Sequence, residues 1–262
     1  MVRINMVFMS VSVEVVPSLE DNYIYLAVSH GAAVVIDPGD CAPAAVALSA
    51  CGLSAEAILV THRHADHMAG VGALSRLYPK AAIYAPAECN IAGAREVSDG
   101  SRLSLLSGAL SLETLPVPGH TLGHVAFYGS GLLFCGDALF ACGCGRMFEG
   151  TATQMYESVL RLSSLPPETR AYCGHEYTLN NIAFARAAEP DNEALLTREH
   201  QAKATRARGL PTMPFTISEE LATNPFIRVR ESTLIGSARS HGALDDSPVS
   251  VFAALRGWKD EF

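Results

Sequence analysis

The segment THRHADHMAG, residues 61–70, places three histidines and an aspartate within six positions. It follows the apolar run EAILV, which is typical of a buried β-strand. In an extended chain, residues i and i+2 point the same way, so His62 and His64 can bind one metal ion side by side. Asp66 and His67 follow after the chain turns and can reach a second ion. Imidazole and carboxylate ligands suit zinc, iron or manganese better than calcium.

Three more residues of ligand type stand where an apolar run gives way to a glycine-containing loop. His120 follows LPVPG, Asp137 follows LLFCG, and His175 follows AYCG. Functional side chains in open sheets commonly lie at such strand ends. Each residue alone has an ordinary interpretation, as a turn residue or a hydrogen-bonded structural group. Their combination with the first segment favours a metal site with two ions.

The number of ligands predicts two metal sites that share one carboxylate. A carboxylate has two oxygens, and paired metal ions lie about 3.5–4 Å apart, so Asp137 can bridge them. A bridging water would complete both sites and give a hydroxide near neutral pH. Asp66 and Asp137, which flank that hydroxide, are therefore the expected catalytic residues. The expected ligand sets are His62, His64 and His120 for one ion, and Asp66, His67 and His175 for the other.

The composition describes a globular protein that has no need of a membrane or a nucleic acid. The chain has 262 residues, of which 49% are hydrophobic and 18% charged. A formal net charge of −8 argues against non-specific nucleic-acid binding. The chain contains no run of the roughly 18–20 uninterrupted apolar residues that a membrane helix needs. We interpret residues 1–17 as an N-terminal strand rather than a signal peptide, and the seven cysteines as reduced thiols of a cytoplasmic monomer.

The first two-thirds of the chain shows short apolar strands separated by glycine and proline, with occasional helices. Two β-rich stretches with helices between them predict two stacked sheets covered by helices. The predicted strands are 11–16, 22–29, 32–39, 56–61, 81–85, 102–106, 111–117, 124–129, 131–135 and 170–173, and the predicted helices are 42–52 and 67–79.

The character of the sequence changes near residue 178, beyond which helical patterns dominate. Thr216 and Glu219 stand at capping-box spacing at the start of one such pattern. We therefore expect a catalytic domain over 1–177 and a small helical, substrate-binding domain over 178–262. The helices predicted in that second part are 191–209, 216–224 and 247–262.

The ligand pattern resembles the metallo-β-lactamase superfamily, whose signature is H-x-H-x-D-H with a downstream His, Asp and His. This resemblance implies an α/β (α+β) fold, a four-layer αββα sandwich with the metals at one edge. Within the superfamily the chain is similar to the glyoxalase II, or hydroxyacylglutathione hydrolase, branch. That similarity rests on GDALFACGCGRMFEGTATQMYESVL (136–160), YCGHEYT (172–178), NPFIR (224–228) and LRGWKDEF (255–262).

The narrower resemblance implies hydrolysis of S-D-lactoylglutathione, or a related 2-hydroxyacyl-glutathione, as the second step of methylglyoxal detoxification. It implies two divalent metal ions, zinc before iron or manganese. Glutathione carries two carboxylates, which basic side chains recognise. Many relatives have Lys at position 146 and Tyr at position 148, so the arginine here keeps the charge and the phenylalanine loses the hydroxyl. The family's glutathione contacts map onto Arg146, Phe148, Tyr177, Arg256 and Lys259.

Several residues near the motifs have structural interpretations instead. His124 is expected to support the site without binding metal, since ligand histidines usually have orienting partners. Asp37 is expected to be a turn residue or such a partner, and Cys142 and Cys144 to be structural thiols.

Three other functions compete with thioester hydrolysis. The first is a mononuclear iron dioxygenase that acts on glutathione persulfide, a branch that uses fewer of these ligands. The second is a binding protein built on a decayed site, although every expected ligand type is present. The third is an RNA-processing hydrolase, which the acidic net charge disfavours.

Overall fold

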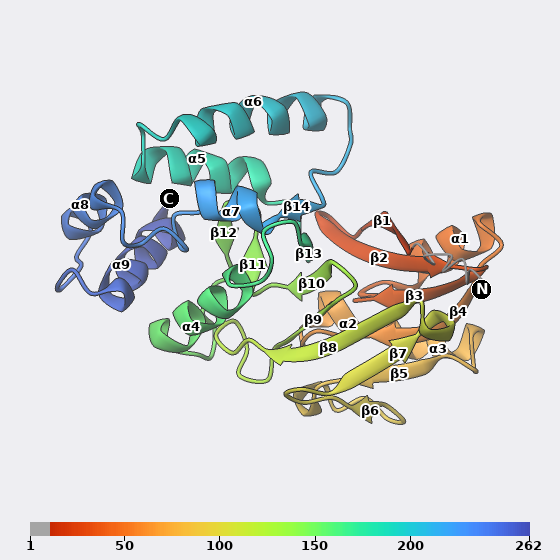
Figure 1. Ribbon diagram of the computed structural model, residues 1–262. Coiled ribbons are helices and arrows are strands. Elements are labelled where there is room, and N and C mark those ends of the chain that lie inside the picture. The colour runs from red at the N-terminus through yellow and green to blue at the C-terminus, as the bar shows by residue number, and fades with distance from the viewer. Residues whose placement is uncertain (1–10) are drawn as a thin grey trace, which may run out of the picture.

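The computed structural model describes residues 11–262 (Figure 1). The part of the expected N-terminal strand that falls on residues 1–10 lies outside the described residues. Within the described part of the chain, no helix is long and apolar enough to cross a membrane.

The first sheet has six strands in the order β1-β2-β3-β4-β5-β6. Strands β1 to β3 pair antiparallel, and the pairs from β3 to β6 are parallel. Parallel neighbours need crossover connections, and helices α1 (Cys41–Ala50), α2 (Ala65–Met68) and α3 (Val71–Leu77) lie in them. The strands are β1 (Ser12–Ser18), β2 (Asn22–Ser29), β3 (Ala32–Ile36), β4 (Ser54–Leu59), β5 (Ala82–Ala85) and β6 (Arg95–Glu96).

The second sheet has the order β14-β13-β10-β9-β8-β7, and its pairs are antiparallel except β10 with β13. A short hairpin, β11 (Leu139–Phe140) and β12 (Gly143–Cys144), follows β10. Of two 3-10 turns, η1 (Ala87–Cys89) lies between β5 and β6 of the first sheet, and η2 (Leu106–Gly108) lies between β7 and β8 of the second. The strands of the sheet are β7 (Arg102–Leu105), β8 (Leu110–Pro116), β9 (Val125–Gly129), β10 (Leu132–Gly136), β13 (Arg170–Cys173) and β14 (Phe215–Thr216).

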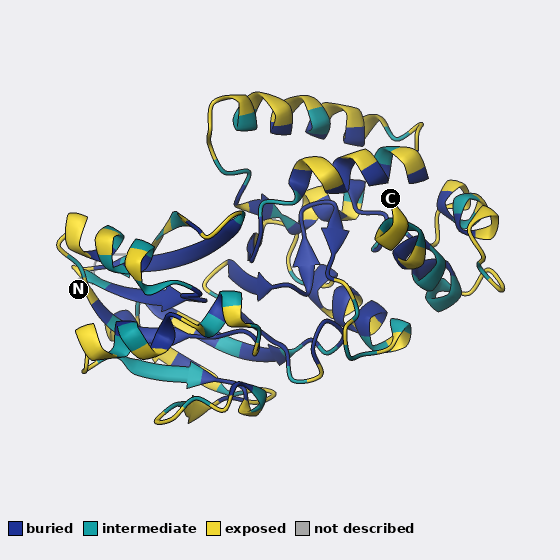
Figure 2. Ribbon diagram, turned by 180° about the vertical axis from the view of Figure 1, so that it is seen from behind, coloured by how far each residue is buried: buried dark blue, intermediate teal, exposed yellow. Residues whose placement is uncertain are grey.

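Strand β2 shows how the layers form. Side chains alternate between the faces of a strand, and Tyr23 and Tyr25 point into the main core, between the sheets. Ile24 and Leu26 point the other way, into a second core beneath helices α1 and α3. On the far side, helix α4 (Ala152–Ser163) buries Met155 and its neighbours against the second sheet. The four-layer αββα sandwich is therefore confirmed, and Figure 2 shows its strands mostly buried and its outer helical faces exposed.

Five helices follow the sandwich and gather at one end of it (Figure 1). Phe184, Phe226 and Phe252 from this part belong to the same core cluster as the sheets, so the apolar interior runs on into the helices. The expected C-terminal helical part is therefore present. The helices are α5 (Thr178–Ala188), α6 (Glu193–Ala207), α7 (Ile217–Thr223), α8 (Ser232–Ser240) and α9 (Pro248–Glu261).

The predicted capping box is confirmed, because Thr216 and Glu219 exchange hydrogen bonds at the start of α7. The single helix predicted over 67–79 is wrong, since the chain breaks between α2 and α3 at Gly70. There the Gly70 N–H donates to the carbonyl of Pro38 at 2.9 Å, and a Cβ would lie 2.5 Å from that oxygen. Helices α4, α5 and α8 were not predicted.

Candidate metal centre and adjoining pocket

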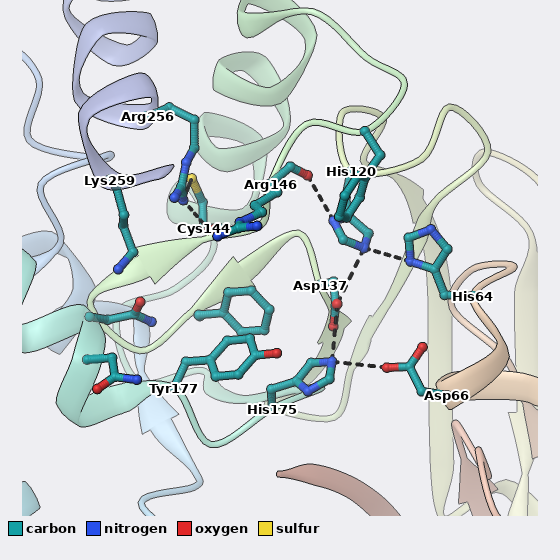
Figure 3. Close-up of a pocket in the computed structure, with 14 residues that line it drawn as sticks. His64, Asp66, His120, Asp137, Cys144, Arg146, His175, Tyr177, Arg256 and Lys259 are labelled. Carbon is teal, nitrogen blue, oxygen red and sulfur yellow. Dashed lines mark hydrogen bonds and ion pairs between the residues drawn. The ribbon is translucent and has the colours of Figure 1, made fainter. Parts of the chain in front are cut away.

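The structure brings all seven predicted ligands together. Figure 3 shows the five that line the adjoining pocket, His64, Asp66, His120, Asp137 and His175. Strand β4 delivers the H-x-H-x-D-H segment, and the loop between β8 and β9 delivers His120. Asp137 directly follows β10, and His175 follows β13. Strands of both sheets therefore end at one place.

His62, His64 and His120 form the first cluster, and their ligand atoms lie within 4.8 Å of one another. Nδ1 of His64 is 3.1 Å from Nε2 of His62 and 3.0 Å from Nε2 of His120. Two nitrogens that each bind a tetrahedral zinc ion at about 2.0–2.1 Å are about 3.3 Å apart. The spacing of these three nitrogens is therefore close to what one shared ion requires.

Asp66, His67 and His175 form the second cluster. Oδ2 of Asp66 is 3.6 Å from Nε2 of His67 and 3.4 Å from Nε2 of His175. Asp137 lies between the clusters: its Oδ1 is 3.3 Å from Nε2 of His67, and its Oδ2 is 3.4 Å from Nε2 of His120. One carboxylate thus touches ligands of both clusters, as a bridging group must.

The second-cluster histidines are each braced from behind by a carboxylate. Nδ1 of His67 lies 3.0 Å from Oδ2 of Asp37, and Nδ1 of His175 lies 2.7 Å from Oδ1 of Asp21. A carboxylate accepts hydrogen bonds, so both Nδ1 atoms carry a proton. This leaves Nε2 of each ring as the atom that can bind a metal ion, and both Nε2 atoms point into the site.

The same arrangement fixes two histidines of the first cluster. Nδ1 of His120 donates to the carbonyl of Arg146 at 2.9 Å. The Thr61 hydroxyl donates to Asp37 at 2.7 Å, so it accepts from Nδ1 of His62 at 3.0 Å. Partners of this kind set the tautomer and orientation of metal-binding histidines.

The residues fit divalent cations. Nε2 of His67 and Oδ1 of Asp137 are buried and have no hydrogen-bond partner among the described residues. Burial lowers the pKa of His62 and of His120, which keeps both rings neutral, the form that binds metal. Converging histidine nitrogens and a buried carboxylate oxygen without a hydrogen-bond partner are what cations satisfy.

Asp37 performs both roles that the sequence suggested. It lies at a turn with φ of 52°, and its carboxylate accepts from the Thr61 N–H and hydroxyl as well as from His67. His124 also behaves as expected. Its Nε2 accepts from the backbone N–H of Asp137 at 3.1 Å, and burial lowers its pKa to about 3. Its ring supports the site without joining either cluster.

Sequence reasoning missed the turn between β1 and β2. Asp21 braces His175, and the Asn22 side-chain amide donates to Oδ2 of Asp66 at 2.9 Å. In the sequence, the dipeptide Asp21-Asn22 indicates only a turn. The one usable signal was that a ligand histidine needs an oxygen partner on its other nitrogen.

Glu176 ties that turn to the helical part of the chain. The Tyr23 hydroxyl donates to its Oε2 at 2.8 Å. Thr212, in the connection between α6 and β14, donates its N–H to Oε2 at 2.8 Å and its hydroxyl to Oε1 at 2.7 Å. We call this three-residue contact the Glu176 latch.

A pocket of about 640 Å³ opens beside the two clusters. Metal-ligand candidates form one wall, and three cationic side chains stand across from them (Figure 3). Asn180 and Asn181 also line it and were not foreseen. All five side chains expected to contact substrate line this pocket: Arg146, Phe148, Tyr177, Arg256 and Lys259.

The two aromatic side chains of that set contact the ligand histidines directly. The Tyr177 ring stacks on His175 with centroids 4.7 Å apart and planes within 5°. Phe148 is 63% exposed and presents its ring edge-on to His64 and His120. The aromatic rings therefore border the metal-ligand wall.

The cationic side chains are less free than the sequence suggested. Arg256 is only 2% exposed, and its guanidinium donates to the carbonyl of Cys144 at 2.8 Å and to Asp260 at 3.1 Å. Burial, followed by repulsion from Arg256, lowers the pKa of Lys259 to about 8. Its Nζ lies 5.1 Å from the centre of the Phe184 ring.

The cysteines do not join the clusters. All seven are free thiols. Burial raises the pKa of Cys142 to about 12 and that of Cys144 to about 11, which keeps them protonated. Thiolates rather than thiols bind metal, so these two residues are structural, as expected.

Comparisons with known proteins agree with this architecture. Residues 19–175 match the family model of the metallo-beta-lactamase superfamily, and residues 176–262 match that of the hydroxyacylglutathione hydrolase C-terminus. A curated relative from Methylobacillus flagellatus, named hydroxyacylglutathione hydrolase, is 51% identical over 95% of this chain and 99% of its own.

Two solved structures show the same fold. ETHE1 from Myxococcus xanthus superposes with a TM-score of 0.65 at 24% identity, over 96% of this chain and 98% of its own. TTHA1623, described in a di-iron-bound form, has a TM-score of 0.57 at 27% identity, over 80% of this chain and 98% of its own.

Proposed function

Because the chain belongs to the hydroxyacylglutathione hydrolase family of the metallo-β-lactamase superfamily, we propose that it hydrolyses 2-hydroxyacyl thioesters of glutathione. S-D-lactoylglutathione, which gives glutathione and D-lactate, is the substrate of choice and makes the reaction the second step of methylglyoxal detoxification. One observation carries the proposal. Two histidine and aspartate clusters face three cationic side chains across a single pocket.

We assign two divalent ions to the clusters, zinc before iron or manganese. When bound, they supply Lewis acidity and bring the pKa of water to about 7. The di-iron form described for TTHA1623 supports the count of two and keeps iron as an alternative. The residues that would hold the ions are His62, His64, His120, Asp66, His67, His175 and Asp137.

The two aspartates have different tasks. Asp137 touches both clusters, so it holds their positions relative to one another. Asp66 uses Oδ2 for Asn22, and its Oδ1 makes no hydrogen bond within residues 11–262. That oxygen is free to accept a hydrogen bond from the attacking water. Both carboxylates therefore border the place where the nucleophile forms.

The other side chains bind and position the substrate. Arg146, Arg256 and Lys259 offer positive charge to the carboxylates of the glutathione half. Phe148 and Tyr177 border the ligand histidines and hold the thioester against them. Phe148 lacks the hydroxyl of many relatives, so it contributes contact area without a hydrogen bond.

We propose residues 1–177 as the catalytic domain and 178–262 as the substrate-binding helical domain. A single chain supplies both walls of the pocket, which supports action as a monomer. Seven unpaired thiols support the cytoplasm as its location.

The test follows the loss of thioester absorbance of S-D-lactoylglutathione and measures metal on the same sample. We expect rapid hydrolysis with about two metal ions per chain. Removal of the ions by a chelator abolishes hydrolysis, and zinc restores it. A folded, fully loaded protein that leaves the thioester intact would contradict the proposal.

The persulfide dioxygenase alternative is less supported, because relatives up to 51% identical carry the hydrolase name. Oxygen uptake with glutathione persulfide, without thioester hydrolysis, would favour it.

A further inference from the structure

The cationic wall of the pocket has its own carboxylate. Asp260 lies in the last turn of α9, one helical turn after Arg256. Its Oδ1 accepts from Arg256 at 3.1 Å and lies 3.3 Å from Nε of Arg146. Among residues 11–262, no other acidic side chain pairs with the three cations of this wall.

The two arginines hold Asp260 in different ways. The Arg256 side chain is buried, donates to the carbonyl of Cys144, and lies 5.1 Å from the centre of the Phe226 ring. The Arg146 side chain is 62% exposed and its guanidinium pairs with Asp260 alone within the described residues. Exposed ion pairs exchange readily because water screens them. The contact between Arg146 and Asp260 is thus the replaceable one.

We propose that Asp260 is an internal competitor for the substrate: its carboxylate occupies Arg146 in the free protein, and a carboxylate of the glutathione half takes its place on binding. This inference rests on the proposed function. A carboxylate of glutathione can offer Arg146 two oxygens, whereas Asp260 meets it with Oδ1, which it shares with Arg256. Asp260 is 40% exposed and remains tied to Arg256, so it can release Arg146 without leaving the helix.

The competitor acts on substrate and product alike, since both carry the glutathione carboxylates. It weakens their binding uniformly, so it raises KM and speeds the departure of glutathione. Three cationic side chains share one carboxylate, so the wall keeps an excess of positive charge. An incoming anion is therefore favoured even while Asp260 is in place.

The experiment replaces Asp260→Asn and measures glutathione binding by calorimetry and KM for S-D-lactoylglutathione. We expect Kd and KM both to fall about 3–10-fold, because a freed cation gains a charge-assisted partner. Asp260→Ala should shift both in the same direction. The matched control is Asp246→Asn, which removes the same charge from an exposed pair with Arg239 and should leave both constants unchanged.

A double variant tests whether the effect of Asp260→Asn depends on Arg146. In an Arg146→Gln protein, Asp260→Asn should no longer tighten glutathione binding. Equal tightening in both backgrounds would overturn the exchange at Arg146. Unchanged or weaker binding by Asp260→Asn, in an enzyme whose parent hydrolyses the thioester, would overturn this inference alone. A parent protein that neither binds glutathione nor hydrolyses the thioester would overturn the proposed function as well.

Discussion

The two walls of the pocket are held by opposite means. On the metal-ligand wall, four of the five histidines have their far nitrogen fixed by an oxygen, as with Asp21 behind His175. On the cationic wall, Arg146 and Arg256 share one half-exposed carboxylate. The first wall is built before anything binds, and the second adjusts when something does. Substitutions should therefore change metal content and rate on one side, and affinity on the other.

The largest effect is expected from the carboxylate between the clusters. Asp137→Ala removes the carboxylate that lies between ligands of both clusters. We expect a loss of kcat/KM of about a thousandfold or more, with metal content below that of the parent. Metal analysis and thioester hydrolysis measure both. His200→Ala, an exposed histidine on α6, is the control and should change neither. Full metal content with near-normal turnover would remove Asp137 from the centre.

A smaller effect on the same wall is expected from Asp21→Asn. The amide cannot replace the carboxylate as a strong acceptor for His175. Loss of such a partner costs about 10–100-fold in metal affinity. Competition with a coloured chelator measures this directly. Glu20→Gln changes an exposed neighbour in the same turn and should leave the affinity unchanged. Equal affinities in all three proteins would show that His175 needs no partner.

On the cationic wall, Lys259→Ala should change affinity without changing metal content. Loss of one charge-assisted contact raises KM about tenfold, with kcat nearly unchanged. Steady-state kinetics and metal analysis on one preparation test this split. Lys203→Ala, on the exposed face of α6, is the matched control. A fall in kcat with KM unchanged would move Lys259 to the reacting end of the pocket.

The smallest effect is a pH dependence of the same contact. Burial lowers the pKa of Lys259 to about 8, so the side chain loses its charge as pH rises through that value. KM should therefore rise a few-fold between pH 7.5 and 9.5, a range set by that pKa. In Lys259→Arg the charge persists at every pH of the range, so this rise should disappear. Parallel profiles for the two proteins would exclude Lys259 as the cause.

The lowered pKa of Lys259 also makes the stability of the folded protein depend on pH. The unfolded chain holds the Lys259 proton up to about pH 10.4, whereas the folded protein releases it near 8. Between these values the unfolded state binds more protons, so the contribution of Lys259 to stability rises with pH.

The clustering of these histidines and aspartates was predictable because metal chemistry restricts residue type, and strand ends restrict position. The ligand-type residues from His62 to His67 stand together in one short segment, and His120 and His175 follow apolar runs. Asp21 could not be found in the same way. Its contact with His175 joins residues 154 positions apart, and only the pairing of sheets creates it. The break at Gly70 was hidden for a similar reason, because its cause is the carbonyl of Pro38.

Other features are visible in the sequence, some of them fully and others only in part. The start of α4 carries a capping box, Thr151 with Gln154, which the sequence TATQ displays. Helical spacing placed Arg256 and Lys259 on one face of α9, and both do line the pocket. Spacing says nothing about Cys144, whose carbonyl takes up part of the Arg256 guanidinium. The presence of the Arg256 charge could be predicted, but the hydrogen bonds that its guanidinium already makes could not.

The Glu176 latch completes the centre late in the order of synthesis. A ribosome releases the chain from its N-terminus, so the three histidines of the first cluster and the Arg146 carbonyl that orients His120 have all been made once residue 146 is added. Glu176 receives its last donors only from Thr212. The support of the turn that braces His175 is therefore completed about sixty-five residues later. The residues of one cluster and their partners are all made before the support of the other cluster is complete.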